Sequence, residues 1–386
     1  MSPGAHPFER FGHAALLVDR SGSDGDGALV YNYGTFDAND PELVQKFLRH
    51  TMPFWLSVGT WRDTKRLYAR RSILIQELDL DEEEARVLAA RLADNARPAH
   101  RMYVYEFFRD NCSTRVRDMV SSVVRELTQA QEQPPRASLR GHVRDVLAPV
   151  PLFRRAIDLA LNERVDAPGS RWDDAFLPRE LAILLRETRR LDGRPVVARE
   201  HLWTGPEFRD LTRPLSPSLS WGLELGWLLL LLPLVLAAGL GMRRPATRTL
   251  GGSGLALWGL ATGLIGVGLA VMATTPYDVA RHNANLLALW PGLLALVPYG
   301  VRLALGRLDA KGWLRLRILV MLVLVPVLLD VGWHLLGRAQ QRHLELLLFV
   351  AAGHLLTLVG LRGGPAPEIS PQRDGACDSP LALPRA

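Results

Sequence analysis

The chain has 386 residues, of which 48% are hydrophobic, with two cysteines and a formal net charge of +6 at pH 7. Two cysteines are too few for a disulfide framework. The second cysteine does not lie near Cys112, so no zinc-binding spacing is present, and we expect neither metal nor cofactor. Cys377 falls in a Pro/Gly/Ser-rich tail, which argues against a disulfide with Cys112. The sequence contains no motif that would bind a groove of DNA or RNA, so we expect no nucleic-acid partner despite the positive charge. Arginines that flank the predicted membrane segments explain this charge.

The first part of the chain predicts a β-hairpin that carries a histidine. Residues 11–18 run from a turn into a strand, with His13 near its start. A polar Gly/Ser/Asp loop follows at 19–27, and residues 29–33 predict a second strand. Residues 79–95 then predict a helix, because acidic residues crowd its first turn.

Cys112 stands where a strand is expected to become a helix. Residues 102–108 are rich in aromatic and β-branched side chains and predict a strand. After Cys112, apolar residues recur with helical spacing at Val116, Met119, Val120, Val123, Val124 and Leu127. A thiol in the first turn of a helix meets free N–H groups and the macrodipole, which lower its pKa and make it reactive. The alternative is a small buried hydrophobe, as most lone cysteines are.

His13 is the candidate base for such a nucleophile, since a Cys–His pair need not be close in sequence. A structural, hydrogen-bonding role is the alternative for a lone histidine at the start of a strand. Asn32 lies on the strand expected beside that of His13, and its amide oxygen could accept the other ring N–H. Tyr33 points to the opposite face, so only one of the two can orient the ring; Asp37 is a third candidate.

The second half of the chain predicts a membrane domain. From about residue 219 the sequence consists of apolar runs near the roughly 20 residues that cross a bilayer. Prolines at 291, 298 and 326 predict kinks within these runs. We expect five transmembrane helices, at 221–241, 253–273, 284–305, 317–336 and 343–361.

The loops between these helices predict the orientation. Basic residues cluster in the first and third loops (Arg243, Arg244, Arg248; Arg307, Lys311, Arg315, Arg317), and fewer occupy the opposite side (Arg281, Arg338, Arg342). The positive-inside rule places the first set in the cytoplasm and the N-terminal domain in the periplasm. An exported domain needs a leading export segment, and none precedes His6, so we expect an internal start at Met1 or a leading segment outside this sequence.

Three motifs carry a resemblance to a known family. They are Phe11-Gly12-His13-Ala14-Ala15-Leu16, Val30-Tyr31-Asn32-Tyr33-Gly34-Thr35-Phe36-Asp37 and Tyr105-Glu106-Phe107-Phe108-Arg109-Asp110-Asn111-Cys112-Ser113-Thr114-Arg115. Together with His282-Asn283-Ala284-Asn285-Leu286-Leu287, they make residues 3–300 similar to the Lnb family of bacterial membrane proteins. The family's usual leading export segment is missing.

The resemblance implies both a fold and an activity. The fold would be α+β, a circularly permuted papain-like (NlpC/LRAT-like) domain followed by an all-α five-helix transmembrane domain in the bacterial inner membrane. The activity would be lipoprotein N-acylation: an acyl chain passes from a phospholipid through a Cys112 thioester to the N-terminal amine of a diacylated lipoprotein. A cell-wall peptidase or amidase of the NlpC type remains an alternative, as does a non-enzymatic lipid-binding factor with an inert Cys112.

The expected layout is a thiol acyltransferase domain at 1–210, a transmembrane domain at 211–364 and a disordered cytoplasmic tail at 365–386. Cys112, His13 and Asn32 are the expected catalytic residues. Substrate contacts are expected from residues near the thiol and from a polar loop before the third helix, namely Tyr33, Asp37, Asn111, Ser113, Arg115, His282, Asn283 and Asn285. For Asn111 and for the polar loop before the third helix, a helix-capping role is the alternative to substrate contact. Asp330 and His334 share one face near the outer end of the fourth helix and are functional suspects or partners of each other.

Overall fold

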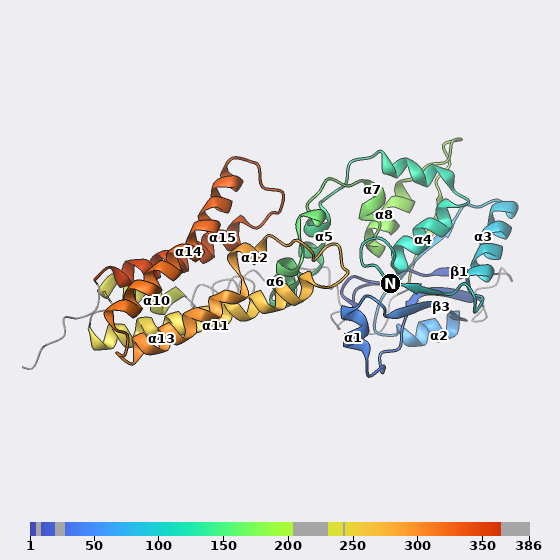
Figure 1. Cartoon of the computed structure of the whole chain (residues 1–386). Coiled ribbons are helices and arrows are strands. Elements are labelled where there is room, and N and C mark those ends of the chain that lie inside the picture. Colours follow the sequence, from blue (N-terminus) through green and yellow to red (C-terminus); the bar gives the residue numbers. More distant parts are fainter. Residues whose placement is uncertain (5–8, 20–27, 204–230, 242–243, 364–386) are drawn as a thin grey trace, which may run out of the picture.

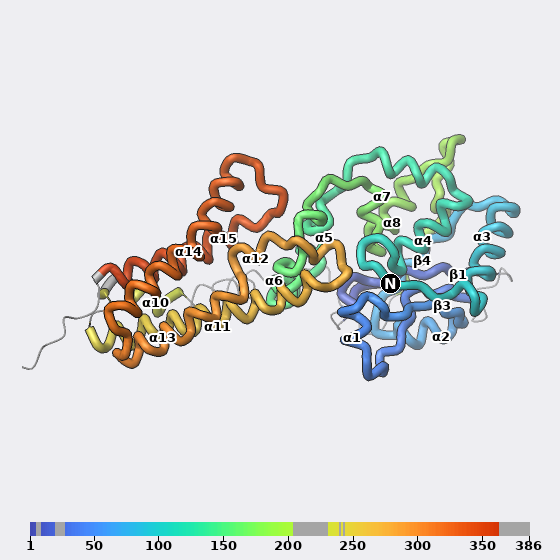
Figure 2. Tube along the Cα trace, in the orientation of Figure 1, coloured from blue at the N-terminus to red at the C-terminus, as the bar shows by residue number. Residues whose placement is uncertain are grey.

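The computed structural model describes residues 1–4, 9–19, 28–203, 231–241 and 244–363. A sheet-containing part, coloured blue to green, forms one end of the molecule, and a bundle of long helices in yellow to red forms the other (Figure 1). The backbone trace in Figure 2 shows that the helical part extends away from the sheets along its own long axis. The mixed N-terminal domain and helical C-terminal region expected from the sequence are therefore present.

The N-terminal part is built on a four-stranded sheet. Its strands are β1 (Leu16–Val18), β2 (Leu29–Thr35), β3 (Pro53–Thr60) and β5 (Met102–Val104), in the order β1-β2-β3-β5 with antiparallel pairing throughout. The predicted hairpin of β1 and β2 is confirmed, with Leu16 opposite Tyr31. His13 lies just before β1, so the hairpin brings it alongside the middle of β2.

A second sheet joins distant parts of the chain. β4 (Ile73–Leu78) pairs antiparallel with β6 (Val197–Trp203), and Gln76 lies opposite Glu200. Gln76 also donates to Glu200 (2.7 Å) and to the carbonyl of Ala182 (2.8 Å). Residues near position 200 therefore belong to the same folded unit as the first hairpin.

The elements around Cys112 are shorter than the sequence predicted. The predicted strand 102–108 ends at Val104, because the Glu106 carboxylate accepts N–H bonds from Phe108 (3.1 Å) and Arg109 (2.7 Å) and closes a turn. Helix α4 (Cys112–Ser121) also ends early. Of the remaining apolar positions, Val123 and Val124 lie in the turn that follows, and Leu127 lies in a 3₁₀ segment, η2 (Arg125–Gln131). Helix α3 (Glu82–Asn95) is capped by Asp81, which forms a capping box with Glu84. Its start is close to the predicted one.

Short helices complete this domain. They are α1 (Leu43–Leu48), α2 (Trp61–Leu67), α5 (Leu139–Val146), α6 (Pro151–Ala160), η3 (Glu163–Val165), α7 (Arg171–Asp174) and α8 (Pro178–Glu187). One hydrophobic core joins the first sheet with α3, α4 and α8 and contains Cys112 itself. A second core packs Phe108 and Phe176 against α5 and α6.

The C-terminal region consists of apolar helices. They are α10 (Leu232–Leu240), α11 (Pro245–Ala273), α12 (Asn285–Ala288), η5 (Pro291–Ala295), α13 (Leu296–Ala304), α14 (Ala310–Leu335), α15 (Leu344–Gly360) and η6 (Leu361–Gly363). Among the described residues, three spans are long and apolar enough to cross a membrane: 245–273, 285–304 and 310–335. Helix α15 is apolar but shorter, with 17 residues. Residues 221–230 of the first predicted span lie outside the described residues.

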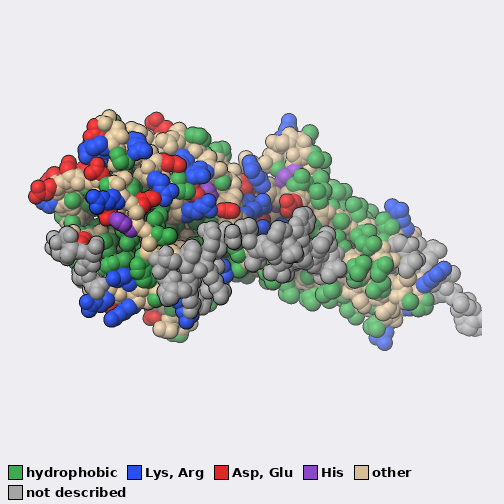
Figure 3. Space-filling view, turned by 180° about the vertical axis from the view of Figure 1, so that it is seen from behind, with side chains coloured by type: hydrophobic (Ala, Val, Ile, Leu, Met, Phe, Trp, Pro, Cys, Tyr) green, Lys and Arg blue, Asp and Glu red, His purple; other side chains and the backbone are tan. Residues whose placement is uncertain are grey.

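The surface of the helical region matches a lipid environment. Figure 3 shows hydrophobic side chains covering its length, whereas acidic and basic side chains cover the other domain. Leucines on the outward faces are open to the surroundings, among them Leu322, Leu329 and Leu348. Such a large exposed apolar surface is expected of a membrane protein and is rare in soluble monomers.

Small residues and prolines shape the bundle. A Cβ on Gly300 would lie 2.5 Å from the backbone nitrogen of Ala256, so this glycine lets α13 approach α11 closely. The predicted interruption at Pro291 is present as the break between α12 and η5, whereas Pro326 lies inside the continuous helix α14.

Polar contacts tie the two parts together. The side-chain amide of Asn162 donates to the carbonyls of Asp278 (2.7 Å) and Arg281, in the segment that follows α11. The N–H of Arg342, between α14 and α15, donates to the Asp166 carboxylate (3.0 Å). Because Asp166 also accepts from the buried Arg140 (2.8 Å), this junction continues into the interior of the first domain.

Candidate active site

Cys112 is the first residue of α4, and its neighbours explain why the helix begins there. The Asn111 side-chain oxygen accepts from the N–H groups of Ser113 (2.7 Å) and Thr114 (2.9 Å), and Thr114 returns a bond to the Asn111 backbone (2.8 Å). This capping box fixes the first turn and therefore the direction of the Cys112 side chain. The thiol is free and buried.

Burial decides the charge state of the thiol. It raises the pKa of Cys112 above the usual value of 9.0, although the backbone N–H groups of Ala14, Ser113 and Cys112 act in the opposite direction. The sequence predicted a lowered pKa from the helix position alone. That prediction was incomplete, because desolvation disfavours the thiolate more strongly than the N–H groups favour it.

His13 is held by the second strand. Its Nε2 contacts the Asn32 side-chain oxygen, as the sequence predicted in preference to Tyr33 or Asp37. Its ring stacks on Tyr68 with 5.9 Å between ring centroids, and its backbone N–H donates to the carbonyl of Met1 (3.2 Å). Because Nε2 donates to an amide oxygen, the neutral ring keeps its lone pair on Nδ1.

Burial also keeps this imidazole neutral. It lowers the pKa of His13 from 6.5 to about 4, and the bond from Asn32 opposes that shift. A neutral thiol and a neutral imidazole are therefore the resting forms near pH 7. The ring can accept a proton, and it has no positive charge with which to stabilise a thiolate beforehand.

The hairpin and α4 meet at this point. The backbone N–H of Ala14, the residue after His13, donates toward the Cys112 sulfur and lowers the pKa of that thiol. Gly34, with a φ of +88°, lies so close that a Cβ there would be 3.5 Å from the Cys112 Cβ. The entry to β1, the end of β2 and the start of α4 thus surround the thiol. Sequence reasoning missed Ala14 and Gly34, although a glycine inside a predicted strand is a recognised sign of close backbone approach.

Aromatic and basic side chains form the adjoining wall. Arg115 makes two bonds to the Asp110 carboxylate (2.6 and 2.8 Å) and lies 3.7 Å from the centre of the Tyr103 ring. The Tyr33 hydroxyl is buried without a hydrogen-bond partner among the described residues, and burial raises the pKa of Tyr33 to about 12. Arg115 keeps part of its surface open and could still contact an anion.

A small enclosed cavity of about 40 Å³ adjoins the thiol. Its lining is mostly aromatic and apolar: Phe11, Gly12, Tyr105, Phe107, Asn111, Cys112, Phe176, Leu177 and Pro178. Sites for small molecules usually enclose about 300 Å³ or more. The cavity must therefore widen before an acyl chain could occupy it.

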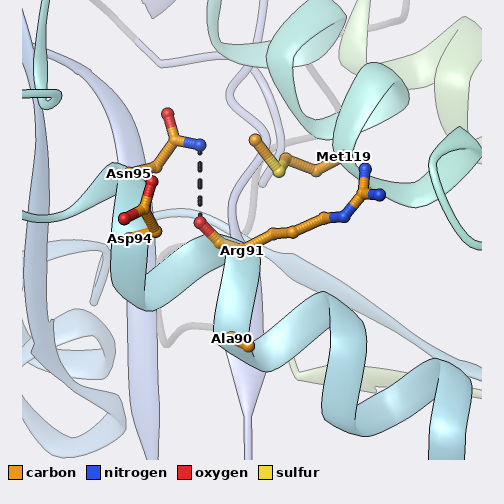
Figure 4. Close-up of a pocket in the computed structure, with 5 residues that line it drawn as sticks. All are labelled: Ala90, Arg91, Asp94, Asn95 and Met119. Atoms are coloured by element: carbon orange, nitrogen blue, oxygen red, sulfur yellow. Dashed lines mark hydrogen bonds between the residues drawn. The ribbon is translucent and has the colours of Figure 1, made fainter.

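A larger hollow lies elsewhere in the domain, between α3 and α4. It measures about 420 Å³ and is lined by Ala90, Arg91, Asp94, Asn95 and Met119. In Figure 4, Arg91 and Met119 face each other across it, and Asn95 bonds to the Arg91 carbonyl. It includes neither Cys112 nor His13, so it is not the site of thiol chemistry.

The structure gives two of the expected substrate contacts roles within the fold. Asn111 caps α4 and donates to the carbonyls of Phe107 (2.6 Å) and Phe176 (3.0 Å), so both ends of its amide are engaged. Ser113 is fully buried and donates to the carbonyl of Ala175 (2.8 Å). Asp37 is exposed in the turn after β2 and accepts from the Asn39 N–H (2.9 Å), whereas the His13 ring contacts Asn32.

The polar loop before α12 lies at the domain junction. Asn283 and Asn285 are buried, and both donate to the carbonyl of Leu159 in α6 (2.7 and 2.8 Å). His282 is exposed with a left-handed φ of 53°. The two asparagines therefore hold the domains together and do not face an open surface for lipid.

Comparison with known proteins identifies the N-terminal region. Residues 1–148 match the family described as the Lnb N-terminal periplasmic domain. The match supports the resemblance of this region to the Lnb family. No curated protein matches the chain. No solved structure matches it either.

The Lnb match covers the expected catalytic residues, while part of the cavity lining, at 176–178, lies beyond it. His13, Asn32 and Cys112 all lie within residues 1–148, as do the hairpin and α4. The apolar helices follow this region in the sequence. The chain is therefore a membrane protein with an Lnb periplasmic domain at its N-terminus.

Proposed function

We propose that this protein is a thiol-dependent lipoprotein N-acyltransferase of the bacterial inner membrane. One observation carries the proposal: the hairpin that holds the His13–Asn32 contact also brings the N–H of Ala14, the residue after His13, to Cys112, which begins α4 beside a small apolar cavity. A helix-terminal thiol, a base and a group that orients the base are the parts of an activated nucleophile. The permuted papain-like fold that the family resemblance implies is part of the same proposal.

The first step transfers an acyl chain from a phospholipid to the enzyme. As the Cys112 sulfur attacks the ester carbonyl, Nδ1 of His13 takes the thiol proton, so no preformed thiolate is needed. The carbon–sulfur bond forms, the ester carbon–oxygen bond breaks, and His13 gives its proton to the departing lysophospholipid. Asn32 keeps the ring in the required orientation and tautomer throughout.

The second step transfers the chain to the acceptor. The α-amine of a diacylated lipoprotein attacks the thioester, a carbon–nitrogen bond forms, and the sulfur leaves. His13 takes the proton from the amine and returns it to the Cys112 sulfur. The backbone N–H groups of Ala14, Cys112 and Ser113, which already act on the sulfur, are the groups we assign to the developing oxyanion.

The membrane helices explain why the acyl donor would be a lipid. The junction through Asn162, Asp166 and Asn283 fastens the thiol domain to the apolar helices. Basic loops on one side of the predicted spans support a multi-pass protein whose thiol domain faces the periplasm. A thiol held there meets phospholipids and membrane-anchored lipoproteins together.

Two other functions would use parts of the same structure. A cell-wall peptidase or amidase would need the same thiol and base, but it could be anchored by a single helix. A non-enzymatic lipid-binding factor would leave Cys112 inert. The apolar lining beside the thiol favours acyl transfer, because a peptide substrate would require polar groups for its backbone.

The direct test is to trap the acyl-enzyme. The full-length protein is incubated with phospholipid vesicles, and its intact mass is measured before and after treatment with neutral hydroxylamine. We expect one added acyl chain that hydroxylamine removes, and its transfer to a synthetic diacylated lipopeptide with a free amine. Cys377→Ser, at the only other cysteine, should behave as wild type, and Cys112→Ser should form no thioester.

The same variants separate the competing functions in cells. Mass spectrometry of lipoprotein N-termini should show a third acyl chain with the wild-type protein and none with Cys112→Ser. Lipoproteins that stay diacylated beside active, folded wild-type protein would rule out the acyltransferase. Release of peptidoglycan fragments that depends on Cys112 would instead favour the peptidase.

A further inference from the structure

A cluster of buried polar groups lies where α14 gives way to α15, distant in sequence from the thiol site. It contains Asp330 and His334 from the end of α14 and His343 just before α15. One ligand-type atom from each of the three lies within 4.8 Å of the others. The side chains of His334 and Asp330 are about nine-tenths buried, and that of His343 more so.

In each of the two histidine rings, both nitrogens face an oxygen atom, which is one acceptor more than a neutral imidazole can serve. His334 directs Nδ1 at the carbonyl of Asp330 and Nε2 at the carbonyl of Gln341, both at 2.9 Å. His343 directs Nδ1 at the same Gln341 carbonyl (3.1 Å) and Nε2 at the Asp330 carboxylate (2.9 Å). A neutral imidazole has one N–H, so each ring leaves one nitrogen lone pair facing an oxygen.

Two protonated rings would satisfy these contacts only at a high electrostatic cost. The imidazole rings lie 4.7 Å apart, and Asp330 supplies a single negative charge for both. Like charges this close, away from water, disfavour each other strongly. A bound cation removes the conflict, because it accepts the nitrogen lone pairs and the oxygen lone pairs together.

We infer that Asp330, His334 and His343 bind one divalent transition-metal ion through His334 Nδ1, His343 Nε2 and the Asp330 carboxylate, while the other nitrogen of each ring donates its N–H to the Gln341 carbonyl. Two histidine nitrogens and a carboxylate suit Zn²⁺ and related first-row ions. With metal–ligand bonds of about 2.1 Å, two tetrahedral ligands lie about 3.4 Å apart. The Asp330 carboxylate oxygens lie 3.3 Å from His334 Nδ1 and 2.9 Å from His343 Nε2, so small shifts would admit the ion. Sequence spacing alone led us to expect no metal, because it considered only the cysteines.

The neighbours of the site give the ion a structural role. The side chain of Gln341 accepts from the Ala284 N–H (3.0 Å) and donates to Asn283 (3.0 Å), which holds the carbonyl of Leu159. The next residue, Arg342, donates to Asp166. A metal that fixes the Gln341 main chain therefore fixes the loop that fastens the thiol domain to the membrane helices.

Metal analysis of the purified full-length protein tests this inference. The protein carries a tag without histidine, is purified in detergent, loaded with Zn²⁺ and dialysed, and its metals are measured by mass spectrometry. We expect about one transition-metal ion per chain in wild type and about a tenth of that in His334→Gln and His343→Gln. These variants keep an N–H donor but lose the imidazole ligand. His100→Gln, at an exposed histidine that pairs with Asp94, should retain the wild-type content.

Thermal unfolding provides a readout that needs no enzymatic activity. A chelator should lower the unfolding temperature of wild type and of His100→Gln, and added Zn²⁺ should restore it. The folded ligand variants, checked by size-exclusion chromatography, should not respond to either. If both glutamine variants fail to fold, Asp330→Asn takes their place. Wild-type protein that binds no transition metal after loading, or equal metal in wild type and ligand variants, would overturn the inference.

Discussion

His13 and Asn32 face each other across the first hairpin, with the imidazole Nε2 against the amide oxygen, 19 residues apart in the sequence. This contact fixes the tautomer of the ring and leaves a lone pair on Nδ1, the atom that accepts the proton in the proposed reaction. Because the contact also raises the pKa of a base that burial lowers, Asn32 affects both the position and the strength of His13.

Replacing Asn32 should therefore change the rate and its pH dependence together. Asn32→Ala should reduce acyl transfer by roughly 10- to 100-fold, the usual effect of losing a partner that orients a functional histidine. Asn32→Asp places a negative charge beside the ring, so the pKa of His13 should rise and the acidic limb of the profile should move toward neutral pH. Thioester formation measured from pH 4 to 8 tests both variants. An unchanged limb in Asn32→Asp would show that Asn32 does not orient the base.

The wild-type profile should be flat over the physiological range. His13, whose pKa is about 4, stays neutral and able to accept a proton above about pH 5. Below pH 4 the ring becomes protonated, and kcat/KM should fall tenfold per pH unit. A limb centred near pH 6.5 would mean that His13 is solvated when the enzyme works.

The pH dependence of Cys112 alkylation should show that the resting side chain is a neutral thiol and not a thiolate. In a Cys377→Ser background, iodoacetamide should react slowly at pH 7. The rate should rise about tenfold per pH unit up to pH 9, because burial raises the pKa of this thiol above 9.0. Equal rates at pH 6 and pH 9 would reveal a thiolate at rest and contradict the neutral pair.

Gly34 should resist substitution because of its backbone conformation. Its φ of +88° is strained for any L residue, so Gly34→Ala should lower the free energy of unfolding by about 1–3 kcal/mol. Gly59 in β3 is the matched control, since a Cβ there would meet nothing within 4 Å and its φ is not positive. Denaturant unfolding in detergent measures both variants. Similar losses at the two positions would contradict the conformational explanation.

Arg140 should be important for stability. Its side chain is 2% exposed and pairs with Asp158 (2.9 Å) and Asp166 (2.8 Å). Asp158 keeps its pair with Arg144 (2.8 Å) in Arg140→Met, whereas the fully buried Asp166 carboxylate loses this counter-charge. We expect a loss of about 3–5 kcal/mol in the free energy of unfolding. Arg86→Met removes a pair with Glu83 (2.6 Å) in which both side chains are exposed, and it should cost far less. Equal losses, measured by denaturant unfolding, would show that burial does not matter here.

Local patterns predicted much of this molecule. Alternation and turn residues were sufficient for the β1–β2 hairpin, and long apolar runs were sufficient for the spans at 245–273, 285–304 and 310–335. The start of α4 was also predictable, because Asn111 is a strong capping residue immediately before a helical pattern. Its end was not, because the apolar periodicity continues unchanged from α4 into η2.

The sequence by itself thus determined that a helix-terminal Cys112, a histidine at the entry to a strand and several long apolar segments occur in one chain. Only the tertiary structure decided that Asn32 holds the imidazole and that Asn283 and Asn285 fasten the two domains together. It also decided that Asp330, His334 and His343 converge. The physical reason is that capping and periodicity act over a few residues, whereas burial, desolvation and contacts between distant segments depend on the whole fold. The raised pKa of Cys112 shows the difference, because its own helix favours the thiolate and the surrounding core disfavours it more.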